Sequence, residues 1–273
     1  MNVLWIFAHP EMRSLNGSLH REGVAALTEA GHQVEVSDLY AMKWNPVVGR
    51  EDYDADDDER LYVAHASKKA FEAGTLSADV RAEHEKLNRA DLVVMQFPLW
   101  WFGVPAILKG WIDRVFVRGY AYGLPDPEYP GRSRRYGDGG LAGKRALAVV
   151  TIGGGPEGYG PRGIGGDLEE VLFPLLHGTF FYTGMQPLPP VAVYSANHLS
   201  DEEYQAAAAE LRERLLEALG SPELGLPELG SPGEGATPPI PYRTQNGGDY
   251  DDDGVLLPDV APGESGLRVH RKN

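Results

Sequence analysis

Three continuous apolar segments stand out along the chain, and each is followed by a loop rich in glycine, proline or polar side chains. They cover residues 3–8, 91–97 and 145–151. Parallel strands that are covered by helices on both faces are apolar on both sides, so uninterrupted hydrophobicity predicts buried strands here. Two further strands are expected at 33–37 and 191–194.

Apolar positions at helical spacing lie between these strands. The three clearest stripes are Leu19, Gly23, Ala26, Leu27 and Ala30; Val80, His84 and Leu87; and Tyr204, Ala208, Leu211 and Leu215. Strands that alternate with helices predict an α/β fold with a doubly wound, five-stranded parallel sheet and helices on both faces. Because crossover connections are right-handed, few topologies remain, and a flavodoxin-like strand order is the simplest.

The character of the chain changes after residue 220. Residues 221–273 contain 8 proline and 9 glycine residues. Such a composition is typical of segments that cannot build a hydrophobic core. The sequence therefore predicts one flavodoxin-like α/β domain over 1–220 and an irregular tail over 221–273.

Composition excludes several kinds of chemistry. The 273 residues include no cysteine, which removes disulfides, thiolate nucleophiles and cysteine-based metal sites. Redox chemistry would then need a bound organic cofactor. A net charge of −15 argues against nucleic-acid partners. The histidines show no paired ligand spacing, so no metal site is expected. The chain has no apolar run long enough to cross a membrane, and its first residues read as a strand, so a cytoplasmic protein is expected.

Ligands of open parallel sheets bind beyond the carboxyl ends of the strands. Three loops are selected by this rule, at 9–18, 98–103 and 152–159. The first brings His9, Arg13 and Ser14 to the start of a helix, which fits either a phosphate site or an ordinary helix cap. It matches neither a Walker loop nor the three-glycine dinucleotide motif.

The other two loops have unusual compositions. Trp100, Trp101 and Phe102 stand where small turn residues are usual, which suits stacking on a planar ligand, although a core cluster under the loop is the alternative. Pro105 is expected at the first position of the next helix. Three consecutive glycines at 153–155 let backbone N–H groups approach a ligand, with Tyr159 as a possible donor; a plain flexible loop is the alternative.

Residues 96–111 carry a family resemblance. Their sequence QFPLWWFGVPAILKGW resembles the signature of the NAD(P)H:quinone oxidoreductases, the DT-diaphorase family. The segments SDLYAM at 37–42, Asn45-Pro46 and Leu76-Ser77 resemble the same family in the same order. The resemblance extends from about Val3 to Leu215 and does not clearly include the tail.

This resemblance implies a homodimer that binds FAD, or else FMN, at the subunit interface and uses NAD(P)H and a quinone-like acceptor in turn, by ping-pong hydride transfer. By position, the pyrophosphate and ribityl part of the flavin would be held by His9, Leu15, Asn16 and Ser18. The isoalloxazine ring would be lined by Pro98, Leu99, Trp100, Trp101, Phe102, Thr151, Ile152, Gly153 and Gly154. The substrate pocket would have Trp101 and Phe102 as walls and Tyr122 and Tyr182 of the partner subunit as lids. Asp113 would lie near the partner's adenine, and Tyr159 would be catalytic.

Three departures from the family pattern stand out. The eukaryotic members pair the tyrosine at position 159 with a histidine six residues later, where this chain has Gly165. Tyr204 replaces an adenine-side arginine, and Tyr62 replaces a glutamine. We therefore expect Tyr159 and the glycine-loop N–H groups to handle charge on the reduced flavin without an imidazole.

Two other functions fit parts of the sequence. Small relatives of this family regulate transporters, so a flavin-binding ancillary subunit of a membrane transporter is the main alternative. A flavodoxin-type one-electron carrier is a further one, which the bulky aromatic loop disfavours. The preference between NADH and NADPH stays open, with Arg132, Arg134 and Arg135 as candidates for a 2′-phosphate site.

Overall fold

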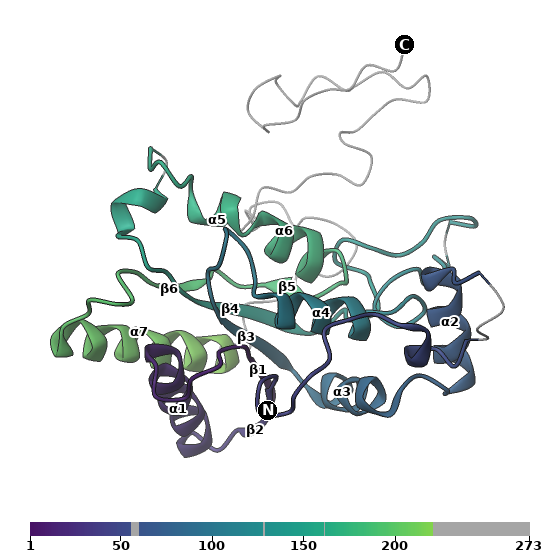
Figure 1. Ribbon diagram of the computed structural model, residues 1–273, viewed down its shortest axis with the longest axis horizontal. Helices are drawn as coiled ribbons and strands as arrows, with labels where there is room; N and C mark the ends of the chain where they lie inside the picture. Colours follow the sequence, from purple (N-terminus) through teal and green to yellow (C-terminus); the bar gives the residue numbers. More distant parts are fainter. Residues whose placement is uncertain (56–59, 128, 161, 221–273) are drawn as a thin grey trace, which may run out of the picture. The chain divides into compact units, whose positions relative to one another are not determined.

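The computed structural model describes residues 1–55, 60–127, 129–160 and 162–220, and the predicted tail at 221–273 lies outside them. A central parallel sheet carries helices on both faces (Figure 1). The strands are β1 (Asn2–Phe7), β2 (Gln33–Asp38), β3 (Leu92–Pro98), β4 (Arg145–Thr151), β5 (Gln186–Pro187) and β6 (Val191–Val193). The strand order β2-β1-β3-β4-β5 confirms the flavodoxin-like topology.

The last edge of the sheet differs from the prediction of a single fifth strand. Both β5 and β6 pair in parallel with β4, at its beginning and its end. Between them stand Pro189 and Pro190, which have no N–H group to donate to a neighbouring strand. The predicted strand at 191–194 is β6, whereas β5, only two residues long, was not predicted.

The helices are α1 (Leu15–Glu29), α2 (Val63–Ala73), α3 (Ala78–Arg89), α4 (Ala106–Val115), α5 (Leu168–Val171), α6 (Phe173–Leu175) and α7 (Asp201–Gly220). Two 3₁₀ turns, η1 (Arg50–Asp52) and η2 (Pro156–Tyr159), and a π-helical turn, η3 (Leu176–Phe181), complete the set. Pro105 precedes α4 with ψ at 148°, so the helix begins one residue later than predicted. None of the helices in the described ranges is long and apolar enough to cross a membrane.

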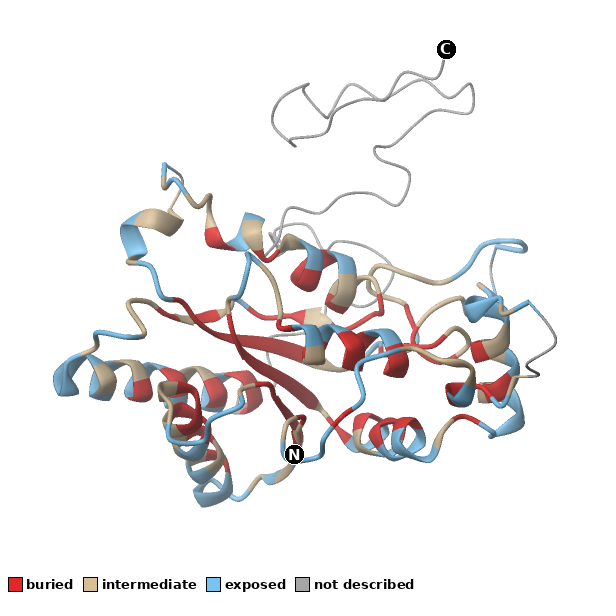
Figure 2. Ribbon diagram, in the orientation of Figure 1, coloured by how far each residue is buried: buried red, intermediate tan, exposed pale blue. Residues whose placement is uncertain are grey.

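The core lies between the sheet and its helices, and Figure 2 shows the central strands as almost entirely buried. Trp5 and Phe7 face α1 and α7, which lie side by side in Figure 1. The predicted stripe of α7 is confirmed, because Ala208, Leu211 and Leu215 are buried in that layer. This packing fixes the carboxyl ends of β1, β3 and β4 next to one another.

A buried ionic cluster anchors α4, the helix that follows the aromatic loop. The Arg114 guanidinium contacts the carboxylates of Asp52, at 2.5 Å, and Asp79, at 2.7 Å, and stacks on the Trp44 ring, 4.5 Å from its centroid. It also donates to the carbonyl of Asn45, at 3.0 Å. Breaking such a buried pair costs about 3–5 kcal/mol, so this cluster holds the long segment before α2 against α4.

Candidate functional site

A chain of buried hydrogen bonds joins residues that lie in, or just before, the three predicted loops. Trp5 donates through Nε1 to Oε1 of Gln96, at 3.0 Å. Gln96 donates through Nε2 to the carbonyl oxygen of Asn16, at 2.8 Å. Asn16 donates through Nδ2 to the hydroxyl of Thr151, at 2.6 Å. The structure thus brings β1, β3, α1 and β4 together at one edge of the sheet.

Gln96 is the residue of this network that sequence reasoning missed. It is completely buried in β3, within a segment whose other residues are apolar. A polar side chain inside such a strand is itself the available signal, because a buried amide must find partners. The side chain of Gln96 has two, Trp5 and the carbonyl of Asn16.

The first loop is a helix cap that leaves one acceptor unused. Ser14 precedes α1 and accepts from the N–H of Gly17, at 3.2 Å, so the helix-cap interpretation is right for Ser14. A Cβ on Gly17 would lie 2.1 Å from the Met12 carbonyl oxygen, so only glycine permits this closure. The Oδ1 atom of Asn16 is buried and has no hydrogen-bond partner among the described residues.

His9 is held by contacts of its Nδ1 atom. This atom lies 3.1 Å from both the N–H and the carbonyl oxygen of Glu11, and 3.0 Å from the Ser14 hydroxyl. A neutral imidazole with Nδ1 as acceptor carries its proton on Nε2, which is then available as a donor. Arg13 pairs with Glu11 at 2.8 Å and lowers the pKa of Glu11 to about 2 through this hydrogen bond. The cation that the sequence offered for a phosphate is therefore already neutralised.

The second loop is a tight turn that presents aromatic side chains to solvent. Trp100 and Gly103 exchange two backbone hydrogen bonds, both 3.1 Å long. Between them Trp101 and Phe102 have φ values of 52° and 58°, in the left-handed region that bulky residues avoid. Trp101 is 98% exposed and Phe102 57% exposed, so the alternative of a core cluster is wrong. Strained backbone that displays flat side chains is typical of ligand sites.

The third loop places Tyr159 beside the aromatic turn. The Tyr159 ring lies 6.5 Å from that of Phe102 and 6.0 Å from that of Tyr194, measured between centroids. Gly154 is so close that a Cβ there would lie 3.2 Å from the Tyr159 ring. Within the described residues the N–H groups of Gly153 and Gly154 donate no hydrogen bond. The third loop therefore contains two free N–H donors and a phenol.

Gly165 packs against the backbone of η2. Its N–H donates to the Gly158 carbonyl, at 2.9 Å, and a Cβ would lie 2.8 Å from that oxygen and 3.1 Å from the Tyr159 ring. A side chain at this position would press on the Gly158 carbonyl and on the Tyr159 ring. The glycine is thus part of how Tyr159 is held, and not simply a lost histidine.

Tyr122 and Tyr182 lie elsewhere in the same chain. Their rings are 6.5 Å apart, and Tyr182 lies 5.2 Å from Tyr136. In the described ranges no ring contact joins Tyr122 or Tyr182 to Trp101 or Tyr159. Asp113 is an exposed residue of α4 and is paired with Lys109 at 2.6 Å. The geometry of one chain therefore leaves these three predicted residues outside the site at the sheet edge.

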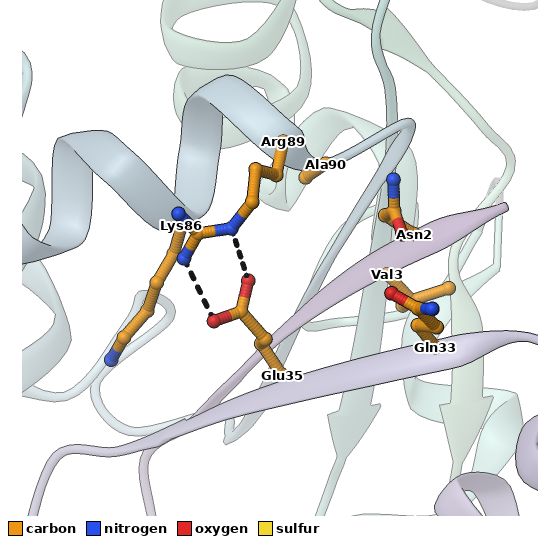
Figure 3. A pocket seen from close by; sticks show the side chains of 7 residues that line it. All are labelled: Asn2, Val3, Gln33, Glu35, Lys86, Arg89 and Ala90. Atoms are coloured by element: carbon orange, nitrogen blue, oxygen red, sulfur yellow. Dashed lines mark hydrogen bonds and ion pairs between the residues drawn. The ribbon is translucent and has the colours of Figure 1, made fainter.

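A separate hollow lies at the opposite end of the sheet (Figure 3). It has a volume of about 330 Å³ and is lined by Asn2, Val3, Gln33, Glu35, Lys86, Arg89 and Ala90. Its charges are satisfied within the chain, since Arg89 binds Glu35 through two hydrogen bonds and Lys86 binds Glu83 at 2.6 Å. It lies at the amino ends of β1 and β2, whereas ligands of open sheets bind at the carboxyl ends.

Comparison with known proteins decides the family. A family model described as Flavodoxin-like fold matches residues 1–215. NAD(P)H dehydrogenase [quinone] 1 of Rattus norvegicus is 41% identical over 198 residues, 72% of this chain and 69% of that protein. The chain belongs to the flavodoxin-like NAD(P)H:quinone oxidoreductase family. The family and the oxidoreductase class predicted from the sequence are thereby confirmed.

Two other proteins match nearly the whole chain. The Ribosyldihydronicotinamide dehydrogenase-like protein traD of Penicillium crustosum is 44% identical over 275 residues, 100% of this chain and 96% of that protein. The crystal structure of a Klebsiella pneumoniae protein assigned as a quinone reductase is 45% identical, with a TM-score of 0.83 and 98% of each chain covered. Enzymes of the quinone oxidoreductase family work with a flavin, so the flavin class of cofactor follows from membership.

Proposed function

We propose that this protein reduces quinone-like acceptors by two electrons at the expense of NAD(P)H, with a bound flavin at the carboxyl edge of the sheet. The observation that carries this proposal is the exposed Trp101–Phe102 turn beside Tyr159. Flat side chains and a phenol at this edge suit a planar ring and a planar substrate. The overall reaction is NAD(P)H + H⁺ + quinone → NAD(P)⁺ + hydroquinone.

The residues at the edge fit a flavin. The unpaired Oδ1 of Asn16 is an acceptor that a ribityl hydroxyl would satisfy. The start of α1 would supply donors for a phosphate, with Leu15 and Ser18 in its first turn, and His9 would donate from Nε2 in the tautomer whose Nδ1 is an acceptor. Pro98, Leu99 and Trp100 after β3, and Thr151, Ile152 and Gly153 at the end of the neighbouring β4, would line the ring.

The flavin, when bound, supplies the chemistry of accepting a hydride and passing two electrons on. The chain's own task is to hold charge and exclude water. The free N–H groups of Gly153 and Gly154 would stabilise the negative charge that develops on the reduced ring, and such stabilisation is greatest when the donors are preorganised. The Tyr159 hydroxyl would supply a further donor from the same loop. Trp101 and Phe102 form the wall against which NAD(P)H and the acceptor stack in turn, which is the ping-pong order.

A homodimer completes the site in this proposal. Trp101 in one chain is almost fully exposed, so the pocket has a wall on one side only. Tyr122 and Tyr182 would close the other side from the second subunit, and Asp113 would meet the adenine of FAD. FAD is proposed over FMN for this reason. We assign the activity to the cytoplasm, where NAD(P)H is supplied.

The visible absorption spectrum of the purified protein tests the cofactor, and mass measurement of the released flavin separates FAD from FMN. NAD(P)H-dependent reduction of a soluble quinone over many turnovers tests the activity. Stopped-flow reduction of the flavin in Tyr159→Phe tests the role of the phenol, and we expect a rate at least about tenfold lower. A colourless protein that takes up no flavin would refute the proposal.

A further inference from the structure

The segment between α4 and β4 contains a hairpin with several arginines. Its two arms are residues 124–126 and 132–134, with Pro125 opposite Ser133 in an antiparallel bridge. The N–H of Asp126 donates to the Arg132 carbonyl at 3.0 Å, and the N–H of Arg134 donates to the Leu124 carbonyl at 2.9 Å. These bonds fix the register, so the position of each arginine along the hairpin is defined.

Two guanidinium groups at the base of the hairpin lack acceptors among the residues that the structure describes. The Nε atom of Arg134 is buried and has no hydrogen-bond partner in the described ranges. Arg118 is half-buried and makes no ion pair or side-chain hydrogen bond in the same ranges. Both arginines contact the same short segment: Arg118 packs on Gly123, with its Cγ 2.8 Å from where a Cβ would stand, and the backbone N–H of Arg134 donates to the carbonyl of the next residue, Leu124.

This arrangement is unexpected in so acidic a chain. The net charge is −15, and several other arginines form ion pairs with carboxylates. Arg132, for example, pairs with Asp126 at 3.6 Å. A buried guanidinium N–H without an acceptor is destabilising, and an anion from outside the chain would remove that cost. Arginine binds phosphate oxygens particularly well because its N–H groups form a planar fork.

Aromatic rings stand next to the same base. Tyr122 forms a backbone bridge with Arg118, and its ring lies 6.5 Å from that of Tyr182. Burial raises the pKa of Tyr122, and the charge of the Arg118 guanidinium partly opposes this rise. Flat rings beside unpaired cations form a surface for a ligand that has both a planar group and phosphates.

We propose that Arg118 and Arg134 bind the phosphates of the nicotinamide nucleotide donor and so make the enzyme prefer phosphorylated donors to the phosphate-free riboside. This inference rests on the proposed function, in which Tyr122 and Tyr182 close the partner's pocket. The phosphates of the flavin are not the ligand, because the donors that suit them lie at the start of α1.

Steady-state kinetics of the flavin-loaded protein with three donors test the inference. NADPH carries a pyrophosphate and a 2′-phosphate, NADH only the pyrophosphate, and dihydronicotinamide riboside neither. In the double variant Arg118→Gln/Arg134→Gln we expect KM to rise about tenfold for the phosphorylated donors and to stay within about twofold for the riboside. A rise for NADPH alone assigns the 2′-phosphate, and a rise for both assigns the pyrophosphate.

A matched control is Arg81→Gln, which removes an exposed positive charge from α3 and should leave all three KM values unchanged. Arg134→Lys keeps the charge without the planar fork and should give a smaller rise. If KM for the phosphorylated donors does not change in the double variant, or rises equally for the riboside, the inference is wrong while quinone reduction stands.

Calorimetry gives a readout that needs no turnover. Adenosine 2′,5′-bisphosphate should bind the flavin-loaded wild type, and it should bind the double variant about tenfold more weakly. Adenosine, which carries no phosphate, should bind the two proteins with equal affinity. A bisphosphate affinity equal in both proteins would refute the anion site. Should no donor support quinone reduction by the wild type, the proposed function fails, and this titration still decides whether the arginines bind phosphate.

Discussion

Asn16 in the first turn of α1 donates through its side-chain amide to the hydroxyl of Thr151, the last residue of β4, at 2.6 Å. The two residues are 135 positions apart in the chain. Both are buried, and the bond ties the helix that would hold the flavin phosphates to the strand that leads into the glycine loop. The site is therefore assembled by core hydrogen bonds and not by its loops alone.

Replacing Thr151 with valine keeps the shape and removes the acceptor. The buried Nδ2 of Asn16 would lose its partner, so we expect the free energy of unfolding to fall by about 1–3 kcal/mol. We also expect weaker flavin binding, because Asn16 would no longer be oriented. Urea denaturation and a flavin titration of the apoprotein measure the two effects. Thr75→Val, at an exposed position, serves as the control, and equal stability of the two variants would contradict the network.

Trp101 is expected to lower the stability of the protein while it contributes to substrate binding. A non-glycine residue in the left-handed region costs about 1–2 kcal/mol, and the exposed indole gains no burial in return. Asparagine tolerates this conformation, so Trp101→Asn should raise the melting temperature slightly and also raise KM for the quinone several-fold. Trp101→Tyr is the matched control, since it keeps a ring and the strain. A variant with asparagine that is less stable than wild type would show that the turn stores no strain.

Sequence patterns located most of this fold because burial dictates them. The three continuous apolar runs became β1, β3 and β4, whose residues have no polar face. The patterns failed where backbone chemistry decides, as at β5, where two prolines interrupt the edge. They also missed Gln96, since its partners Trp5 and Asn16 are brought to it only by the folded sheet.

For the site, sequence reasoning found the correct loops but not their internal geometry. It offered Arg13 as a cation for phosphate, yet Glu11 lies two residues away and neutralises it. It took Gly165 as a missing histidine, whereas the contact of Gly165 with Gly158 shows a close approach that depends on tertiary structure. Such facts depend on distances of a few tenths of an ångström, which residue spacing does not encode.

Gly165 and Gly160 form a matched pair for testing that contact. A Cβ at 165 would meet the Gly158 oxygen at 2.8 Å, while one at 160 would meet nothing within 4 Å. We expect Gly165→Ala to shift Tyr159 and lower the rate of flavin reduction about tenfold or more, and Gly160→Ala to behave like wild type. Gly165→His should be worse than alanine and should not restore imidazole chemistry. A Gly165→His variant faster than wild type would contradict this account.

Two buried histidines predict how stability depends on pH. Burial lowers the pKa of His20, which packs on Phe7 with ring centroids 4.8 Å apart, and its Nδ1 has no hydrogen-bond partner among the described residues. Burial also lowers the pKa of His84, although its hydrogen bond to the Val115 carbonyl, at 2.7 Å, opposes the shift. Both imidazoles are therefore neutral in the folded protein at neutral pH.

Because the folded pKa lies below the unfolded value of about 6.5, the unfolded chain binds protons more readily. The contribution of each histidine to the free energy of unfolding is fully present above about pH 6.5, and it falls as the pH drops from there toward the folded pKa. His20→Phe keeps the ring packing and removes the titrating group. Between about pH 7.5 and about pH 5.5, a range that includes the unfolded pKa, the variant should therefore lose less stability than wild type. Urea denaturation at the two pH values measures it, with the exposed His65→Gln as control. Equal losses in His20→Phe and wild type would mean that His20 does not titrate in this range.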